Sequence, residues 1–389
     1  MIYLDYNATT PLCDDARAAM LPYLDRHFGN PSSVHAAGRE ARAAIDDARD
    51  KLASLLHAKP HELIFTSGGT ESCNLAVLGL AQCRSSRGGH VISNKAEHHA
   101  VLNALEYLEK HEGFEVTWLN VSRQGIIDLD QLADSIRPET RLVSIMSANN
   151  ETGVIQSMHE ISEICRTKGV LLHIDMVQSF GKIDTDPAGA GLVDAASFAA
   201  HKFYGPKGAG LLFLRSGLSI QPIMFGGAHE NERRPGTENV AAIAGMAAAA
   251  EWVEQEDDRE REKRLRDELW NRIEKSFASA VRNGDVDHCL ANTLNVSFPD
   301  IDSETMLMAL DLEGVCASSG SACMVGSVVA SHVLLAMGLP MERASSAVRF
   351  SLGKWTTAEE IDRAADAIDR IFNRLAKTKT KSSSAYAVA

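Results

Sequence analysis

The sequence predicts an α/β protein with a mostly parallel seven-stranded sheet and a smaller α+β domain. Between about residues 62 and 215, short apolar runs alternate with longer segments of helical period, as in strands joined by crossover helices. The runs are apolar at consecutive positions, which is typical of strands covered by helices on both faces. The expected strands are ELIFTS, GHVISN, FEVTWLN, RLVSIMS, GVLLHID, DAASFAA and AGLLFLR.

The length of 389 residues indicates more than one hydrophobic core. Residues 240–277 form a long helical pattern, and its second half is dense in both signs of charge, which we interpret as a solvated helix face. NTLNVSF and SAVRFSL then read as strands, and SETMLMALDLEG and AEEIDRAADAIDRIFNRLAK as helices. We expect a large domain at 15–255, a small domain formed by 1–14 and 256–378, and a disordered tail at 379–389.

The composition excludes some classes of partner. The net charge of −13 argues against nucleic acid or an anionic membrane as the main partner. No apolar run reaches the roughly 20 residues of a membrane span, and MIYLDYNATT lacks the layout of a signal peptide. Seven cysteines at scattered spacings fit neither a disulfide framework nor a zinc site. We therefore expect a cytoplasmic protein with reduced cysteines and no bound metal.

Five of the expected strands end in polar or titratable side chains. In an open parallel sheet, ligands bind at the carboxyl ends of the strands, so these side chains are expected to meet there. After ELIF, the segment TSGGTES has two glycines at which the backbone can approach an anion, and the following helix offers free N–H groups. The alternative for this segment is an ordinary helix cap by Ser67 or Thr70.

Three further strand ends have both a functional and a structural interpretation. Asp175 ends GVLLHID, and a buried carboxylate is costly unless it meets a cation, such as a protonated ring nitrogen. A helix cap or a salt bridge would satisfy Asp175 equally well. His98 begins a helical segment and is compatible with a structural role, and the pair at 149–150 is compatible with a turn.

Lys202 follows DAASFAA at the mouth of the expected pocket. A lysine that is desolvated beside other positive charge loses basicity and becomes a nucleophilic amine, whereas a surface lysine does not. Lys207, in the turn Gly-Pro-Lys-Gly, is expected to be exposed. A reactive amine, a carboxylate for a ring nitrogen, an anion site and a flat ring for stacking are together what pyridoxal phosphate requires. These residues therefore indicate a pyridoxal-phosphate site.

Cys323 is the one cysteine outside a helical or apolar setting. Its segment, ASSGSACMVGSVVASH, lacks a clear helix or strand period, and small residues of this kind suit a loop. An exposed thiol in such a loop is available to react. The alternative is a tight structural turn in which the cysteine is incidental.

From LDYNATTP near its start to VRFSLG at 348–353, the chain resembles the cysteine desulfurases, in the class-V branch of fold-type-I pyridoxal-phosphate enzymes. The shared motifs follow the family's order: FGNPSSVHAAGR, FTSGGTES, AEHHAV, ANNETGVIQ, DMVQSFGK, AAHKFYGPKGAG, RRPGTENV and SSGSAC. The resemblance implies the fold-type-I transferase fold, the cofactor pyridoxal 5′-phosphate and a homodimer.

The resemblance also implies a role for each matched residue. Lys202 would form the Schiff base with the cofactor, Asp175 would hold the pyridine nitrogen, and Gln178 the phenolic oxygen. His98 would stack on the ring and move protons, and Cys323 would carry a persulfide. The other implied contacts are Gly69, Thr70 and His201 to the phosphate, Thr237 to the phosphate of the neighbouring subunit's cofactor, Asn150 to cofactor and substrate, and Arg349 to the substrate carboxylate.

The implied reaction converts L-cysteine to L-alanine. Lys202 and His98 would act as acid and base, and the Cys323 thiolate would attack the substrate sulfur. The spacing between Cys323 and SHVL resembles the long-loop subgroup, which transfers sulfur to scaffold and transfer proteins, for example in iron–sulfur cluster assembly.

Four features depart from the family's pattern. Ala199 stands where a serine is usual, which would remove one hydroxyl donor to the phosphate. Met176 replaces the usual alanine after Asp175 and is expected near the ring, and Ala228 replaces a usual glycine. The loop CMVGSVVASH is more apolar than usual.

These departures leave a second hypothesis open. The protein would then be a pyridoxal-phosphate lyase or aminotransferase-like relative that acts on another amino acid, such as selenocysteine. A non-catalytic relative that only binds partners is a third hypothesis, and the presence of Lys202 argues against it.

Overall fold

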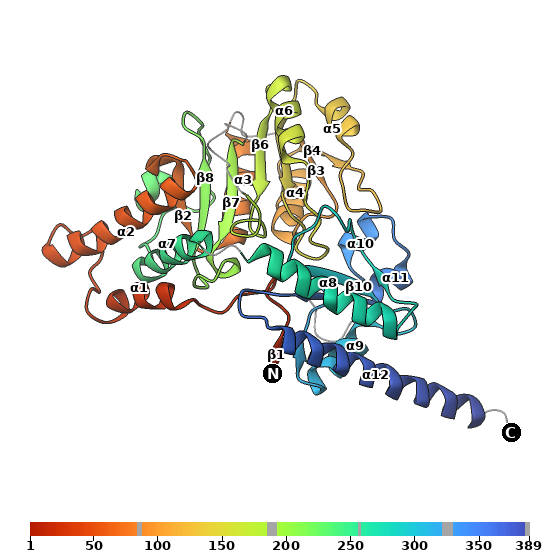
Figure 1. Cartoon of the computed structure of the whole chain (residues 1–389). Coiled ribbons are helices and arrows are strands. Elements are labelled where there is room, and N and C mark those ends of the chain that lie inside the picture. Colours follow the sequence, from red (N-terminus) through yellow and green to blue (C-terminus); the bar gives the residue numbers. More distant parts are fainter. Residues whose placement is uncertain (84–87, 185–192, 256–257, 321–329, 386–389) are drawn as a thin grey trace.

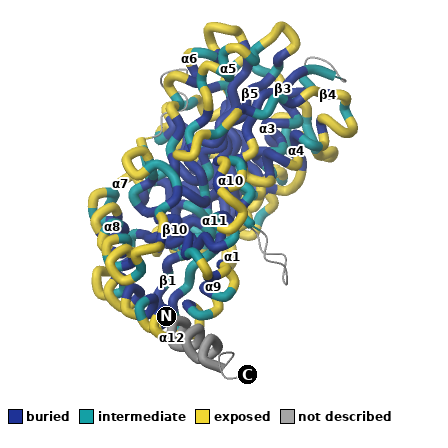
Figure 2. The backbone as a smooth tube through the Cα atoms, turned by 90° about the vertical axis from the view of Figure 1, so that its right-hand side faces the viewer, coloured by how far each residue is buried: buried dark blue, intermediate teal, exposed yellow. Residues whose placement is uncertain are grey.

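The computed structural model describes the chain except for residues 84–87, 185–192, 256–257, 321–329 and 386–389, and describes only the backbone at 375–385. The described residues form two packed regions, each built around its own sheet (Figure 1). Figure 2 shows buried residues in the interior of both regions.

The larger region contains a seven-stranded sheet, as predicted. Its strands are β2 (Leu63–Thr66), β3 (Gly89–Asn94), β4 (Phe114–Leu119), β5 (Thr140–Met146), β6 (Leu171–Asp175), β7 (Ala195–Ala199) and β8 (Gly210–Leu214). Their order is β2-β8-β7-β6-β5-β3-β4. β8 is antiparallel to both of its neighbours and the other pairs are parallel, so the prediction of a mostly parallel sheet is confirmed.

Helices cover both faces of this sheet because successive strand residues face opposite cores. Val91 and Leu142 belong to one core, whereas Ile92 and Val143 belong to the other. The first face is covered by α3 (Gly69–Gln82) and α4 (His99–His111). The second is covered by α1 (Asp14–Asp25), α2 (Ala36–Leu55), α5 (Leu129–Ser135), α6 (Met158–Lys168) and α7 (Val240–Gln255).

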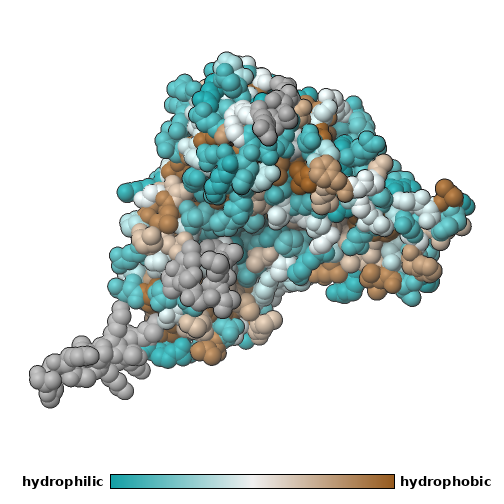
Figure 3. All heavy atoms as spheres, turned by 180° about the vertical axis from the view of Figure 1, so that it is seen from behind, coloured by the Kyte–Doolittle hydropathy of each residue, from teal (hydrophilic) through white to brown (hydrophobic). Residues whose placement is uncertain are grey.

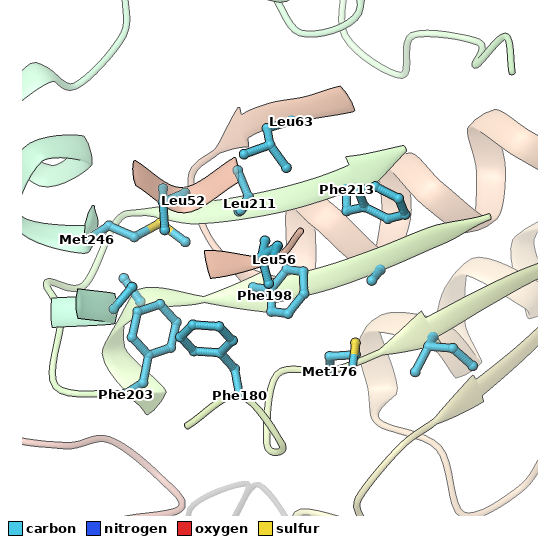
Figure 4. Close-up of a cluster of buried hydrophobic side chains, with 14 of the residues drawn as sticks. Leu52, Leu56, Leu63, Met176, Phe180, Phe198, Phe203, Leu211, Phe213 and Met246 are labelled. Atoms are coloured by element: carbon cyan, nitrogen blue, oxygen red, sulfur yellow. The ribbon is translucent and has the colours of Figure 1, made fainter. Parts of the chain in front are cut away.

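The second core contains a group of aromatic side chains at the end of β7. Phe180 packs edge-on against Phe198 and Phe203, with ring centroids 5.7 and 4.8 Å apart (Figure 4). α7 is alanine-rich and lies close to α1, since a Cβ at Gly245 would come within 2.6 Å of the Met20 side chain. These small residues allow the close helix contact.

The smaller region holds the three-stranded sheet β12-β10-β9 and the parallel pair β1-β11. Its elements are β1 (Ile2–Tyr3), α8 (Arg259–Ser276), β9 (Val281–Arg282), β10 (Thr293–Ser297), α9 (Ser303–Leu312), β11 (Val315–Cys316), α10 (His332–Ala336), α11 (Met341–Ser345), β12 (Ala347–Ser351) and α12 (Ala358–Ala385). The expected strands and helices after residue 290 are therefore present. The pairing of β1 with β11 joins the N-terminus to this region, while the domain boundaries remain a prediction.

One expectation for this region was wrong in part. The charged stretch in α8 is not wholly solvated, because Glu262 and Arg266 are buried, and Arg266 pairs with Asp267 and donates to the Leu290 carbonyl. α12 extends to Ala385 and so includes part of the segment 379–389, whose predicted disorder stays a prediction.

Three short 3₁₀ helices complete the described elements, and they are η1 (Pro60–Glu62), η2 (Ala200–Lys202) and η3 (His229–Glu232). Among the described residues, no helix combines the length and apolar character that a membrane span requires.

Candidate active site

The polar strand ends surround a cavity of about 390 Å³ at one edge of the larger sheet, a size within the range of small-molecule sites. A cavity of about 570 Å³ beside α2 contains none of the predicted site residues. Nine predicted residues line the 390 Å³ cavity: Gly69, Thr70, His98, Asn150, Asp175, Gln178, His201, Lys202 and Arg349. Thr237 is exposed outside it, and Cys323 lies outside the described residues.

Lys202 projects into this cavity from η2, directly after β7. Its Nζ donates hydrogen bonds to the backbone carbonyls of Asn7 (2.8 Å) and Ala8 (2.7 Å). Burial lowers the pKa of Lys202 to about 8, and the charge of Arg349 acts in the same direction. The amine therefore loses its proton far more readily than that of an exposed lysine.

Asp175 ends β6 and faces the same cavity. Its Oδ1 accepts a hydrogen bond from the Val177 N–H (2.9 Å), and its Oδ2 accepts one from the Cys73 thiol (3.5 Å). No salt bridge neutralises Asp175 within the part of the chain that the structure describes. The salt-bridge alternative for this carboxylate is therefore not supported, and a cationic ligand group would complete it.

His98 is the N-cap of α4, where its Nδ1 accepts a hydrogen bond from the Ala100 N–H (3.1 Å). In the neutral ring, the proton therefore resides on Nε2. Burial lowers the pKa of His98, Asp175 opposes this shift, and Lys202 adds to it. The cap and the functional role are compatible, because they use different ring nitrogens.

The expected anion site lies at the start of α3. Gly69 and Thr70 line the cavity, and the first N–H groups of a helix favour an anion. A Cβ at Gly69 would come within 2.8 Å of the Val177 side chain, so the backbone approach requires glycine. His201 contacts the Thr9 hydroxyl through Nδ1 (3.2 Å), and burial lowers its pKa to about 4. His201 is therefore a neutral ring that can donate one N–H.

Arg349, on β12, reaches the cavity from the smaller region. Its Nη2 donates to Asp5 Oδ1 (2.7 Å) and its Nη1 to the Asn150 carbonyl (2.8 Å). Its buried Nε has no hydrogen-bond partner among the described residues. A buried, unpaired donor is costly, and a substrate carboxylate could pair with this N–H and with the second N–H of Nη2.

The structure brings residues to the cavity that sequence reasoning did not assign. Asn7 and Glu151 line it, although both belong to motifs used for the resemblance, LDYNATTP and ANNETGVIQ. Burial raises the pKa of Glu151 to about 7, and its Oε2 accepts a hydrogen bond from Ser331. His332 also lines the cavity, and its ring lies 4.5 Å from that of His99. The motif membership of Asn7 and Glu151 was the available signal.

The described chain reaches the cavity again just before the segment that contains Cys323. Ser318 and Arg349 exchange two backbone hydrogen bonds, of 3.1 and 2.6 Å. Ser318 and Gly320 both line the cavity. The SSGSAC motif therefore enters the segment 321–329 from the edge of the site.

Comparison with known proteins identifies the family. Residues 2–364 match the family model "Aminotransferase class-V", so the chain belongs to the class-V aminotransferase family. Its relatives include "Cysteine desulfurase IscS" of Dictyoglomus turgidum, which is 47% identical over 96% of this chain and 95% of that protein. Within the family, the chain belongs with the cysteine desulfurases.

Solved structures agree with this assignment. A NifS-like protein superposes with a TM-score of 0.89 at 37% identity, covering 96% of this chain and 99% of that one. The structure described as "SspA in complex with cysteine" has a TM-score of 0.80 at 34% identity, covering 92% of this chain and 100% of that one.

The cofactor of this family, pyridoxal 5′-phosphate, fits the residues present. The unneutralised Asp175 suits the pyridine nitrogen, and the start of α3 together with His201 suits the phosphate. Lys202 supplies the amine and His98 the flat ring. Each of the four requirements is therefore met at one cavity.

The departures from the family's pattern have different consequences in the fold. Ala199 lines the cavity beside Gly69, as expected for a residue near the phosphate. Met176 does not lie near the ring, because its side chain joins the core on the face covered by α1 and α7 (Figure 4), while Val177 lines the cavity. Adjacent residues at the end of β6 point in opposite directions, which the substitution alone could not reveal. Ala228 is exposed and outside this cavity.

Ala199→Ser is expected to increase the affinity of the apo-protein for pyridoxal phosphate. The added hydroxyl lies at the cavity wall beside Gly69, and one further net hydrogen bond corresponds to about a tenfold gain. Titration of the apo-protein, followed by visible absorption, measures the effect. Ala278→Ser, at an exposed position between α8 and β9, is the matched control and should leave the affinity unchanged. An Ala199→Ser variant that binds no more tightly would show that Ala199 is not a phosphate-side position.

Proposed function

We propose that this protein is a pyridoxal-phosphate-dependent cysteine desulfurase that converts L-cysteine to L-alanine and transfers the sulfur through Cys323 to an acceptor protein. The observation that carries the proposal is the meeting of Lys202, Asp175 and Arg349 at one cavity whose edge leads into the SSGSAC segment. The similarity to cysteine desulfurases over nearly the whole chain supports the same reaction.

The cofactor supplies an electron sink for the bond changes at the substrate Cα, and the chain supplies binding and proton transfer. Asp175 would hold the pyridine nitrogen protonated, and Gln178 would donate to the phenolic oxygen. The Nε–H of Arg349 would orient the substrate carboxylate, beside Asn150. Gly69, Thr70 and His201 would hold the phosphate.

Two groups in the cavity are suited to proton transfer near neutral pH. The amine of Lys202, with its pKa lowered to about 8 by burial, would accept the proton from Cα and return it to Cβ. His98, whose pKa is also lowered by burial, would serve as the second acid and base at the substrate thiol. Both groups line the same cavity, where a bound substrate would lie within reach of each.

In the sulfur-transfer step, the Cys323 thiolate attacks the sulfur of the bound substrate. A sulfur–sulfur bond forms, the bond from Cβ to sulfur breaks, and its electron pair stays with the substrate carbon, which is then protonated. The sum is one thiol and one L-cysteine giving one persulfide and one L-alanine. No external oxidant or reductant is required for this step or for transfer of the sulfur to an acceptor thiol, and a reductant is needed only to release the sulfur as sulfide.

The proposed active form is a homodimer. Phe28, Val34 and Phe225 are 83%, 89% and 87% exposed in the isolated chain, which is unusual for large apolar side chains. Apolar groups are visible at the end of the molecule formed by α1 and α2, on the right of Figure 3. Thr237 is also exposed, as required if it reaches the phosphate site of a neighbouring subunit.

The proposed setting is the cytoplasm, where thiols stay reduced. The acceptor would be a scaffold or transfer protein, as in the long-loop subgroup. The reach of Cys323 to such an acceptor depends on the segment 321–329.

The test is a product assay on the holoenzyme with a panel of amino acids and a reductant present. L-cysteine should yield alanine and sulfide in equal amounts, because one sulfur leaves per alanine formed. The panel includes selenocysteine, alanine and a second thiol amino acid, homocysteine. Rapid turnover of another amino acid with cysteine inert would replace the proposed function with the lyase or aminotransferase-like alternative.

A further inference from the structure

A second lysine, Lys182, contacts two residues that line the proposed cofactor cavity, Gln178 and Asn7. It lies in the turn that follows β6 and that also carries Gln178. Its Nζ donates to Gln178 Oε1 (2.8 Å) and to Asn7 Oδ1 (3.1 Å). It does not line the 390 Å³ cavity, and the resemblance assigns it no role.

These hydrogen bonds fix how two amides are turned. A protonated lysine has only donors, so each amide presents its oxygen to the ammonium form of Lys182. The Nε2 of Gln178 then faces away from Lys182, donates to the Asn7 carbonyl (2.9 Å) and keeps a second N–H. Without Lys182, the hydrogen bond to the Asn7 carbonyl would be the remaining contact, among the described residues, that holds the Gln178 amide in this orientation.

Asn7 connects the same contact to the reactive amine. Its backbone carbonyl accepts hydrogen bonds from both Gln178 Nε2 and Lys202 Nζ. Its side chain is held from both ends, since Oδ1 accepts from Lys182 and Nδ2 donates to Thr293 Oγ1 (2.8 Å). A shift of Asn7 would therefore change the positions of both the Lys202 amine and the Gln178 amide.

We propose that Lys182 is a positioning residue for the cofactor, which turns the Gln178 amide so that an N–H faces the phenolic oxygen and holds Asn7 against Lys202. The inference rests on the proposed function, because it concerns the same cofactor site. In metal sites, mutation of a residue that orients a direct ligand typically lowers affinity by about 10- to 100-fold, and we expect an effect of similar size here.

The surroundings of Lys182 suit a fixed rather than a mobile amine. It lines a cavity of about 20 Å³, together with Lys202 and Glu262. Burial lowers the pKa of Lys182 to about 7, Lys202 and Arg349 act in the same direction, and Glu262 opposes them. The other titratable groups that line this cavity are Tyr6, Tyr204 and Lys354.

The test compares Lys182→Met with Lys207→Met, an exposed lysine on a nearby turn, as the matched control. Lys182→Met should weaken the binding of pyridoxal phosphate to the apo-protein by about tenfold. In the holoenzyme, the pH midpoint of the visible band should shift upward, because the donor held toward the ring oxygen is lost and, below about pH 7, the positive charge of Lys182 is lost as well. Lys207→Met should change neither quantity.

A double variant separates positioning from general packing. If Lys182 acts through the Gln178 amide, Lys182→Met should weaken affinity less in a Gln178→Leu background than alone, because only its contact with Asn7 is then left to lose. Additive effects, or an unchanged affinity in the single variant, would overturn the inference. If Lys182→Met fails to fold, the Lys182→Arg variant tests the positioning role instead. The guanidinium of the arginine also has only donors, so the affinity for pyridoxal phosphate should stay within about threefold of that of the unaltered protein. A loss of affinity as large as that of Gln178→Leu would also overturn the inference.

These outcomes are distinct from failure of the proposed function. If the unaltered apo-protein does not bind pyridoxal phosphate, the proposed function itself is wrong. If it binds the cofactor and the Lys182 variants match the control, only the positioning role is wrong.

Discussion

Lys202→Ala should remove the covalent link to the cofactor and reduce cysteine turnover by on the order of a thousandfold or more. Lys202 is the only lysine among the described residues that line the 390 Å³ cavity, so no described amine there can replace it. The measurements are the visible absorption band of the holoenzyme and the rate of alanine formation. Both should be lost in the variant.

The folded structure of the variant must be preserved for this result to be informative. Loss of Nζ removes two hydrogen bonds to the carbonyls of Asn7 and Ala8, so some loss of stability is expected. Circular dichroism and non-covalent retention of pyridoxal phosphate serve as controls. A folded Lys202→Ala protein that keeps the visible band would show that another amine binds the cofactor.

The pH dependence of cofactor binding follows from the same amine. Because burial lowers the pKa of Lys202 to about 8 from the usual 10.5, the rate of band formation in the apo-protein should rise with pH and reach half of its maximum near pH 8. The free energy of unfolding of the apo-protein should rise between pH 8 and 10.5, since only the unfolded state binds the proton there. A midpoint near 10.5 would indicate an exposed amine.

Cys323→Ala should reduce sulfide release from L-cysteine to the rate measured without enzyme. The substrate's bond from Cβ to sulfur breaks only when a nucleophile takes the sulfur, and the variant lacks that thiolate. The cofactor should still bind, because every residue that lines the described cavity is retained. Sulfide and alanine assays with a reductant, together with the visible band, measure both expectations.

Cys83→Ala is the matched control for this variant. Cys83 is a half-buried free thiol at the end of α3 and does not line the cavity. Its replacement should leave both products unchanged. If Cys323→Ala releases sulfide at the unaltered rate, the persulfide role belongs to another group.

Much of the site could be predicted from the sequence because it depends on local pattern. Consecutive apolar residues specify strands covered on both faces, and in a parallel sheet the strand ends must meet at one edge. Asp175 and Lys202 were therefore expected to lie together, and β6 pairs directly with β7. The lowered pKa of Lys202 also followed from its position at a buried strand end.

Other contributions depend on contacts between residues far apart in the chain. Asn7 forms hydrogen bonds with Lys202, 195 residues away in the sequence, and with Ser351, 344 residues away. No local pattern in the sequence predicts either contact. Arg349 enters the cavity from β12, and its unpaired Nε is apparent only once its other N–H groups are placed.

The sequence by itself determined the strands, their polar ends and the residue types that pyridoxal phosphate requires, because hydrophobic period and hydrogen bonding along the backbone are local. The tertiary structure alone decided that Met176 faces the core, that Arg266 is buried in a charged helix and that Lys182 holds two amides of the site. Side-chain direction and burial are set by which elements pack together, and this packing is decided only when the whole chain has folded.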